Sequence, residues 1–337
     1  MPSETDSQID WQSETSEVEM TRRDRLEELY RRWIYEPVAI AWSDVRTRLG
    51  IVILTIYLLI AGVAVAGLYR TPQTNQAGRF VKMFQDWSVP LGSTNSGTDL
   101  AALIIHSTPF VLLMVLSGGV WATTVAVAVG TVSGYKGGSI DNAIMTVSDF
   151  FMAIPGLPLV IVLAMTFQDA ASNPIYLGVI LTINYWAGLA RSIRSQVLAI
   201  REESYVEASR TMGTSTPRII FKDVLPNIMP YVMVNFVLAA RYTIFASVGL
   251  YFIGVLPYSV KNWGVVLNNA YYQGALYTPG TGHWLFVPMV AIVGLTFGLI
   301  LLSQGMDRIF NPRVRTRLAG ESESTEEVSE TVTGGMP

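Results

Sequence analysis

The sequence contains no cysteine, and only two of its 337 residues, His106 and His283, are histidine. The absence of cysteine excludes a disulfide framework, a thiol nucleophile and cysteine-ligated metal, and two histidines leave little for a histidine-based metal site. We therefore predict no metal and no cofactor. Charged residues are also scarce, at 15% against a usual share of about 25%. The net charge of −3 argues against nucleic acid as a partner.

Sequence motifs of the common enzymes are missing as well. No G-x-x-x-x-G-K-[ST] occurs, so the chain cannot hold a nucleotide phosphate by that loop, and neither H-E-x-x-H nor G-x-S-x-G is present. No pair of carboxylates within the apolar runs suggests a protease or a proton relay, because Asp149 stands alone in its run. The sequence thus predicts a non-enzyme that moves something across a membrane or anchors a complex.

Long apolar runs dominate the middle of the chain. Half of the residues are hydrophobic and the mean hydropathy is +0.38. A membrane-spanning helix needs roughly 20 mainly apolar residues. On that basis we predict an all-α integral membrane protein with six transmembrane helices, at about 49–68, 108–132, 143–167, 175–190, 227–255 and 284–302.

The basic residues predict the orientation. Most of the 23 Lys and Arg residues lie in the N-terminal arm, in the loop between the fourth and fifth spans and in the tail, and few lie on the opposite side. Positive charge marks cytoplasmic loops, so we expect a multi-pass protein of the cell membrane with both termini in the cytoplasm. The apolar run at 49–68 starts too far along the chain and is too long for a secretory signal peptide.

The polar ends flank a predicted permease domain at 48–312. Residues 1–19 and 313–337 are polar and acidic, which predicts disorder. The segment 20–47 is expected in the cytoplasm, and its part at 20–35 has the pattern of an amphipathic helix, either on the inner membrane surface or packed on the protein itself. Arginine outnumbers lysine 19 to 4 and the ends are acidic, which suggests a high-salt organism, with genomic base composition as the alternative.

The loop at 191–230 is long and patterned. Residues 193–212 predict a helix because they hold no Gly or Pro, and Gly213 fits the position after a helix end. Thr216 and Pro217 predict the cap and first residue of a second short helix, which runs to Val224. The sequence therefore predicts a thin cytoplasmic protrusion, or knob, built as helix, turn and helix. It either inserts into a partner protein or only connects the two spans.

The residues of this knob also resemble a known motif. Glu207-Ala208-Ser209, then Gly213, then Leu225-Pro226 is similar to the EAA motif of ABC importer permeases, with Ser209 in place of the usual Ala. Further segments resemble the dipeptide, oligopeptide and nickel branch, in order and at family-like spacing. These are Leu91–Leu100, Gly134–Gly138 with Asp141, Ala153–Pro155, Trp186, Ala190-Arg191 with Arg194, Tyr205-Val206, Phe252–Gly254, Trp263-Gly264, Gly305–Arg308 and Asn311–Arg313.

This resemblance covers roughly residues 45–315 and is that of the C-type permease subunit. It implies a type I ABC importer fold, similar to that of the methionine permease. It further implies a second, homologous permease, two cytoplasmic ATPase subunits and an extracytoplasmic solute-binding protein. On this reading the chain is a translocation subunit without catalysis of its own, and the loop docks in a groove of an ATPase. The residues that the resemblance assigns to this coupling loop are Glu203, Tyr205, Glu207, Ala208, Ser209, Arg210, Gly213, Pro217, Leu225 and Pro226.

Alternatives remain at the level of sequence. Peptides are the substrate that the resemblance favours, while nickel chelates and sugars are rivals within the same fold. A secondary transporter driven by an ion gradient would predict intramembrane carboxylates and internal repeats, and a membrane anchor would have no transport role.

Two charges fall within predicted spans and are candidates for the translocation path: Arg241 and Asp149. A charge at mid-membrane costs about 2.5–3.5 kcal/mol on insertion scales, so Arg241 should face the interior of the bundle. It could line the path, where it would meet a peptide carboxylate. It could instead pair with Asp149 or with a carboxylate of the partner permease, or extend to the membrane interface if its span is shorter.

Overall fold

The computed structural model describes residues 42, 44–258 and 262–310. The predicted acidic arm at 1–19, the amphipathic helix at 20–35 and the tail at 313–337 lie outside the described residues. Within those ranges the only pairing of extended chain is an isolated bridge between Ser93 and Asp99, and the regular structure is otherwise helical. The prediction of an all-α protein is confirmed.

The helices vary widely in length. In chain order they are α3 (Val45–Val65), α4 (Leu100–Lys136), α5 (Gly138–Ala153), α6 (Gly156–Thr166), α7 (Gln168–Ala171), α8 (Pro174–Leu181), α9 (Tyr185–Ile200), α10 (Ser204–Thr211), α11 (Thr216–Ile219), the short π-helix η2 (Ile220–Val224), α12 (Leu225–Phe252), α13 (Trp263–Tyr272) and α14 (His283–Phe310).

Four helical stretches of the described part are long and apolar enough to cross a membrane: Val45–Val65, Leu100–Lys136, Thr216–Phe252 and His283–Met306. They correspond to the predicted first, second, fifth and sixth spans. The pair α5 and α6 makes a fifth candidate if it is one broken span, bent by 81°. The predicted count of six is therefore approximate.

The third and fourth predicted spans differ from single straight helices. In the third, Ile154 is extended (φ −74°, ψ 126°) because a residue before proline avoids the helical region, and Pro155 follows. In the fourth, 175–190, α8 ends at Leu181 and α9 begins at Tyr185, so the expected continuous helix is wrong. The break at 182–184 holds Thr, Ile and Asn, which are weaker helix formers.

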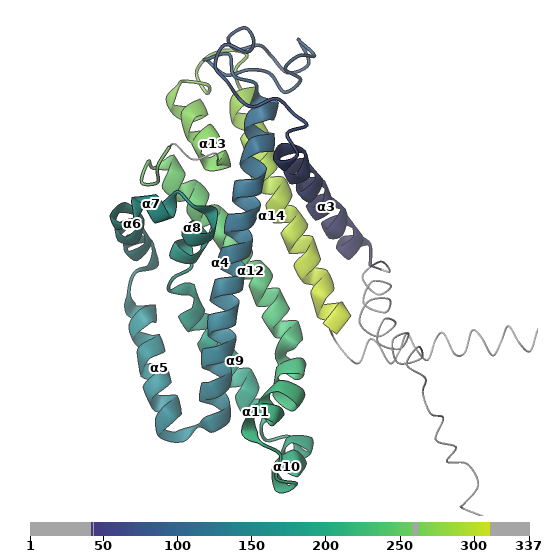
Figure 1. Cartoon of the computed structure of the whole chain (residues 1–337), viewed down its shortest axis with the longest axis vertical. Coiled ribbons are helices and arrows are strands. Elements are labelled where there is room, and N and C mark those ends of the chain that lie inside the picture. Colours follow the sequence, from purple (N-terminus) through teal and green to yellow (C-terminus); the bar gives the residue numbers. More distant parts are fainter. Residues whose placement is uncertain (1–41, 43, 259–261, 311–337) are drawn as a thin grey trace, which may run out of the picture. The chain divides into compact units, whose positions relative to one another are not determined.

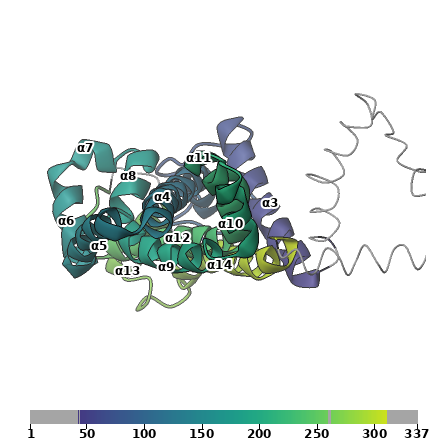
Figure 2. The same ribbon diagram turned by 90° about the horizontal axis from the view of Figure 1, so that it is seen from below.

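The long helices α4 and α12 lie side by side in the middle of the bundle (Figure 1). Figure 2 shows α3 and α14 on one side of them and α5 to α8 on the other. The helix α10 lies at one end of the bundle, and α13 with the segment 66–99 lies at the opposite end (Figure 1). The two ends are therefore built from different parts of the chain.

Small residues bring α4 and α9 into backbone contact. A side chain added at Gly130 would place its Cβ 2.5 Å from the carbonyl oxygen of Ala190, and one at Gly134 would come within 2.9 Å of that of Arg194. Close approach through small residues is a common way for membrane helices to associate. Because α10 follows α9 after three residues, this contact also fixes the position at which α10 begins.

Candidate functional site

The helix α10 is short, and one buried side chain anchors it. Glu203 has the extended backbone of an N-cap residue, and its carbonyl oxygen accepts the N–H groups of Val206 and Glu207 at 3.0 and 3.1 Å. Val206 is fully buried and packs in an apolar cluster with Ile193 of α9 and Ile219 of α11. The predicted single helix over 193–212 is thus two helices, separated at 201–203.

A tight turn at Gly213 ends α10, as predicted. Gly213 has φ +75°, in the left-handed region where a residue with a Cβ is disfavoured. Its N–H donates to the carbonyl oxygen of Arg210 at 3.0 Å, and the N–H of Thr214 donates to that of Ser209 at 3.1 Å. This pair of bonds is the Schellman pattern, which satisfies carbonyl groups at the helix end.

The chain then re-enters the bundle without a second break. Ser215, rather than the predicted Thr216, is the residue before α11, and Pro217 occupies the first turn. As predicted, the short helical segment ends at Val224 and α12 begins at Leu225, with Pro226 in its first turn. The helical stretch Thr216–Phe252 continues through this junction.

Glu207 and Arg210 line a cavity between α10 and the end of α4. The cavity has a volume of about 860 Å³, and Tyr135, Lys136 and Arg201 also line it. The guanidinium carbon of Arg210 lies 5.8 Å from the ring centre of Tyr135, within the range of a cation–π contact. Both predicted charged residues therefore line this cavity, and both are exposed.

Tyr205 links α10 to α12. Its hydroxyl oxygen accepts a hydrogen bond from the side-chain amide of Asn227 at 3.2 Å. Burial, followed by the negative charges of Glu203 and Asp223, raises the pKa of Tyr205, so the phenol stays protonated at neutral pH.

The outer face of α10 is small and apolar. Ala208 is exposed, and Met212, four residues on and therefore on the same face, is 76% exposed. Met212 was not among the residues singled out from the sequence. The sequence did offer a signal for it, which is a methionine directly before the turn glycine. A flexible apolar side chain that is exposed at such a turn suits a contact with a partner.

A partly buried ion pair joins α5 to α9 close to this site. The Nε and Nη2 atoms of Arg194 donate to the two carboxylate oxygens of Asp141 at 2.6 and 2.5 Å, and the hydroxyl of Ser133 donates to the same carboxylate. Asp141 is 7% exposed. About two turns closer to α10, the guanidinium of Arg201 donates to the carbonyl oxygen of Gly134 at 3.0 Å. The resemblance had included Asp141 and Arg194, but the sequence could not place them in contact.

The two candidates for the translocation path are not brought together. Asp149 pairs with Arg191 of α9, and both side chains are about half exposed. The suggested pair of Arg241 with Asp149 is therefore wrong. Arg241 lies on α12, half-buried, and no carboxylate within the described residues pairs with it. In the same part of the chain, no group of three or more His, Cys, Asp or Glu residues is arranged to hold a metal ion.

Comparison with known proteins agrees with this arrangement. Residues 126–316 match the family model described as "Binding-protein-dependent transport system inner membrane component". The dipeptide transport system permease protein DppC of Bacillus subtilis is 36% identical over 194 residues, which cover 57% of this chain and 58% of the relative. The oligopeptide transport system permease protein OppC of the same organism is 30% identical over 206 residues, which cover 60% of this chain and 62% of the relative. The matched part thus spans about three fifths of these two relatives.

The fold has a counterpart among solved structures. An inward-facing structure of the MetNI methionine ABC transporter contains a chain that matches 62% of this one with a TM-score of 0.50 and 20% identity, and 96% of that chain is covered. This likeness concerns the fold alone. It agrees with the predicted type I importer architecture, and the family model covers α10, Gly213 and the ion pair of Asp141 with Arg194. The chain belongs to the family of inner membrane components of binding-protein-dependent transport systems.

Proposed function

We propose that this chain is the non-catalytic translocation subunit of an ABC importer for di- or oligopeptides. Its partners are a second, homologous permease, two cytoplasmic ATPase subunits and an extracytoplasmic solute-binding protein. Peptide is the preferred substrate because both relatives described above are named as peptide permeases, whereas nickel chelates and sugars have no comparable support.

The observation that carries this proposal is the build of the segment 203–217, which we call the coupling segment. It is a rigid helix and turn at one end of the bundle (Figure 1), held by Val206 and closed by the bonds at Gly213. Its outer face offers Ala208 and Met212. We infer that this face docks on the ATPase, while Arg210 contacts Tyr135 of α4 and steadies the coupling segment against the bundle.

The connections of the coupling segment suggest how force is transmitted. At one end α10 follows α9, which is held to α4 by the close approach at Gly130 and to α5 by the pair of Arg194 with Asp141. At the other end it continues into the long stretch Thr216–Phe252. Closure of the ATPase pair on ATP would therefore move α9, α4 and α12 together, in the manner of a rigid-body switch between inward- and outward-open states.

The same proposal fixes the orientation. The coupling segment and both termini lie in the cytoplasm, in agreement with the excess of Lys and Arg on that side. The segment 66–99 and α13 then lie outside. Asp149, the carboxylate on which an ion-driven alternative would depend, forms an ion pair at an exposed surface and does not stand alone within the bundle.

Transport by the purified assembly in proteoliposomes tests the proposal. Uptake of a labelled peptide should require both ATP and the solute-binding protein. Uptake that proceeds on an ion gradient without ATP would contradict it.

We place Arg241 on the translocation path, because it lies half-buried on α12 and pairs with no carboxylate of the described residues. In the same assay Arg241→Gln should reduce uptake of an acidic peptide at least tenfold relative to a neutral one, a difference of about 1.4 kcal/mol, because it removes this cation.

Arg191→Gln is the matched control for this variant. Arg191, on α9, carries the same charge as Arg241, but it is paired with Asp149, and both side chains of that pair are about half exposed. The control should change uptake of the two peptides by the same factor. Equal losses for both peptides with Arg241→Gln would assign Arg241 a structural role instead.

A further inference from the structure

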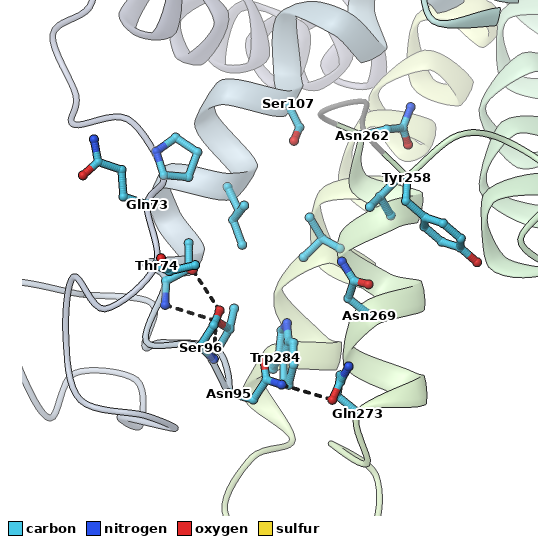
Figure 3. A pocket seen from close by; sticks show the side chains of 16 residues that line it. Gln73, Thr74, Asn95, Ser96, Ser107, Tyr258, Asn262, Asn269, Gln273 and Trp284 are labelled. Atoms are coloured by element: carbon cyan, nitrogen blue, oxygen red, sulfur yellow. Dashed lines mark hydrogen bonds between the residues drawn. The ribbon is translucent and has the colours of Figure 1, made fainter. Parts of the chain in front are cut away.

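The end of the bundle opposite the coupling segment holds a pocket whose walls are neutral. It has a volume of about 460 Å³ and lies where the segment 66–99 meets α13 and Trp284 of α14 (Figure 3). Beside it the amide of Asn95 donates to the side-chain oxygen of Gln273 at 3.1 Å, and none of the described residues that line it is charged. A polar surface along α12, by contrast, carries a cation, so it is the better candidate for holding an ionised ligand.

This surface is a row of polar side chains on one face of α12. Tyr231, Asn235 and Tyr242 are spaced by four and seven residues, which places them on the same face of the helix, and Arg241 is the neighbour of Tyr242. All four are half-buried rather than enclosed. Arg241 lies about 16 Å from the end of α12 at Phe252, which is close to the middle of a hydrocarbon core of about 30 Å.

Tyr185 of α9 completes this polar face. Its ring centre lies 5.0 Å from that of Tyr242. Arg241 lies near enough for its charge to act on the phenol of Tyr185. Within the described ranges, none of these three side chains forms a hydrogen bond or an ion pair. The two hydroxyls and the guanidinium are thus available to a ligand, whereas the unpaired hydroxyl of Tyr251 is enclosed, on a residue that is 0% exposed.

Two helix breaks meet beside Tyr185. This residue directly follows the break at 182–184, and Asn184 of that break lies against the break at 154–155, because a Cβ added at Gly156 would be 3.0 Å from the Nδ2 of Asn184. Non-helical backbone at membrane depth is tolerated only where protein buries it or where it lines a water-filled cavity. In secondary transporters, discontinuous helices form the substrate sites near the middle of the membrane. The breaks therefore support a water-lined path at this level of the bundle.

Lipid does not suit the polar face. A charged side chain in the middle of a bilayer is disfavoured unless it faces the bundle interior or a water-filled cavity. A dry contact with a second protein would leave the guanidinium of Arg241 without a counter-ion, unless that protein supplied a carboxylate. A water-filled path keeps the guanidinium solvated and free to meet each passing ligand.

We propose that Tyr185, Tyr242 and Arg241 form a subsite of the translocation path that holds a peptide by its main chain and by one acidic side chain. The inference rests on the proposed function, in which Arg241 is the counter-ion for the acidic side chain. A phenol hydroxyl both donates and accepts, so each tyrosine can pair with an N–H or a C=O group of a main chain. All peptides share these groups, so the tyrosines hold acidic and neutral peptides alike, whereas Arg241 discriminates between them.

Uptake by Tyr185→Phe and Tyr242→Phe tests the role of the tyrosines. The assembled transporter is assayed in proteoliposomes with ATP and the solute-binding protein, on one acidic and one neutral labelled peptide below saturation. Each variant should reduce uptake of both peptides by the same factor, about fivefold, which corresponds to the loss of one hydrogen bond. The melting temperature should stay that of the wild type, because the hydroxyl that is removed has no partner among the described residues.

Tyr251→Phe is the matched control. It removes the enclosed hydroxyl from the same helix and should leave uptake of both peptides unchanged. Normal uptake by both Tyr185→Phe and Tyr242→Phe, or a loss confined to the acidic peptide, would overturn the assignment. A loss that comes with a lowered melting temperature would do the same, since the tyrosines would then act on folding.

A single added thiol shows whether the polar face meets water. Tyr185→Cys in the assembled transporter should react with a charged methanethiosulfonate reagent, which does not enter lipid, and peptide undergoing transport should slow the reaction several-fold. Val293→Cys, at an apolar position of α14 that is 61% exposed, is the control and should not react.

The thiol reaction also separates this inference from the proposed function. No reaction of Tyr185→Cys, with or without ATP, would place the polar face against lipid or the partner permease and overturn the inference. A wild-type transporter that imports no peptide, together with a reactive Tyr185→Cys, would contradict the proposed function and leave the water-lined face standing.

Discussion

Gly213→Val is expected to abolish ATP-driven transport and association with the ATPase while the chain still inserts in the membrane. The reason lies in the backbone alone. Gly213 has φ +75°, and a Cβ added there would meet no atom within 4 Å, so the valine causes no clash. An L-residue in this conformation costs roughly 1–2 kcal/mol, and more when it is β-branched. The turn should therefore open and release α10 from its position. Pull-down of the ATPase and transport in proteoliposomes measure the effect.

Two further variants isolate the cause. Gly213→Asn should keep most of the transport, because asparagine tolerates the left-handed region. Gly67→Val makes the same substitution at φ +66°, again with no atom within 4 Å, but beyond the end of α3 and outside the coupling segment. It should leave ATPase association unchanged. Full transport by Gly213→Val would rule out our account of the turn.

The second large effect concerns the ion pair of Asp141 with Arg194. The side chain of Asp141 is 9% exposed and that of Arg194 is 28% exposed, so removing one partner of this partly buried pair should cost about 1–3 kcal/mol. Asp141→Ala and Arg194→Ala should each lower the melting temperature of the purified assembly strongly. The double variant Asp141→Leu with Arg194→Met should be more stable than either single variant, because it removes both charges together.

Asp149→Ala serves as the control for this series. It breaks the other ion pair between α5 and α9, that with Arg191, whose side chains are about half exposed. Exposed pairs contribute about 0–1 kcal/mol, so the melting temperature should change little. If the double variant were as unstable as the sum of the two single variants, Asp141 and Arg194 would contribute separately and the pair would not join α5 to α9.

The elements that the sequence predicted well depend on local signals. Apolar runs predicted the long helices, and the glycine after a helix-forming stretch predicted the turn at Gly213. The bend in the third span follows from Pro155, whose effect on Ile154 is also local. These signals act over a few residues, so the structure that they predict does not depend on how the rest of the chain packs.

Features that depend on the packing of separate elements could not be predicted from the sequence. The carboxylate of Asp141 could have met any of several arginines, and its bond to Arg194, 53 residues away, is decided by the close contact of α4 with α9. For the same reason Asp149 meets Arg191 and not Arg241. The pocket that Trp284 lines also forms only when separate elements come together. The same holds for the exposed position of Met212.

The absence of cysteine allows the central claim to be tested with a single added thiol. Met212→Cys, labelled with a photoactivatable benzophenone maleimide before the ATPase subunits are added, should cross-link the chain to an ATPase subunit when the assembled transporter is irradiated, because Met212 lies on the face of α10 that we assign to docking. Tyr277→Cys, at a position 77% exposed and at the other end of the bundle, is the control and should give no such product. A labelled Met212→Cys that leaves transport intact but forms no adduct with an ATPase subunit, or an ATPase adduct from Tyr277→Cys, would contradict the account.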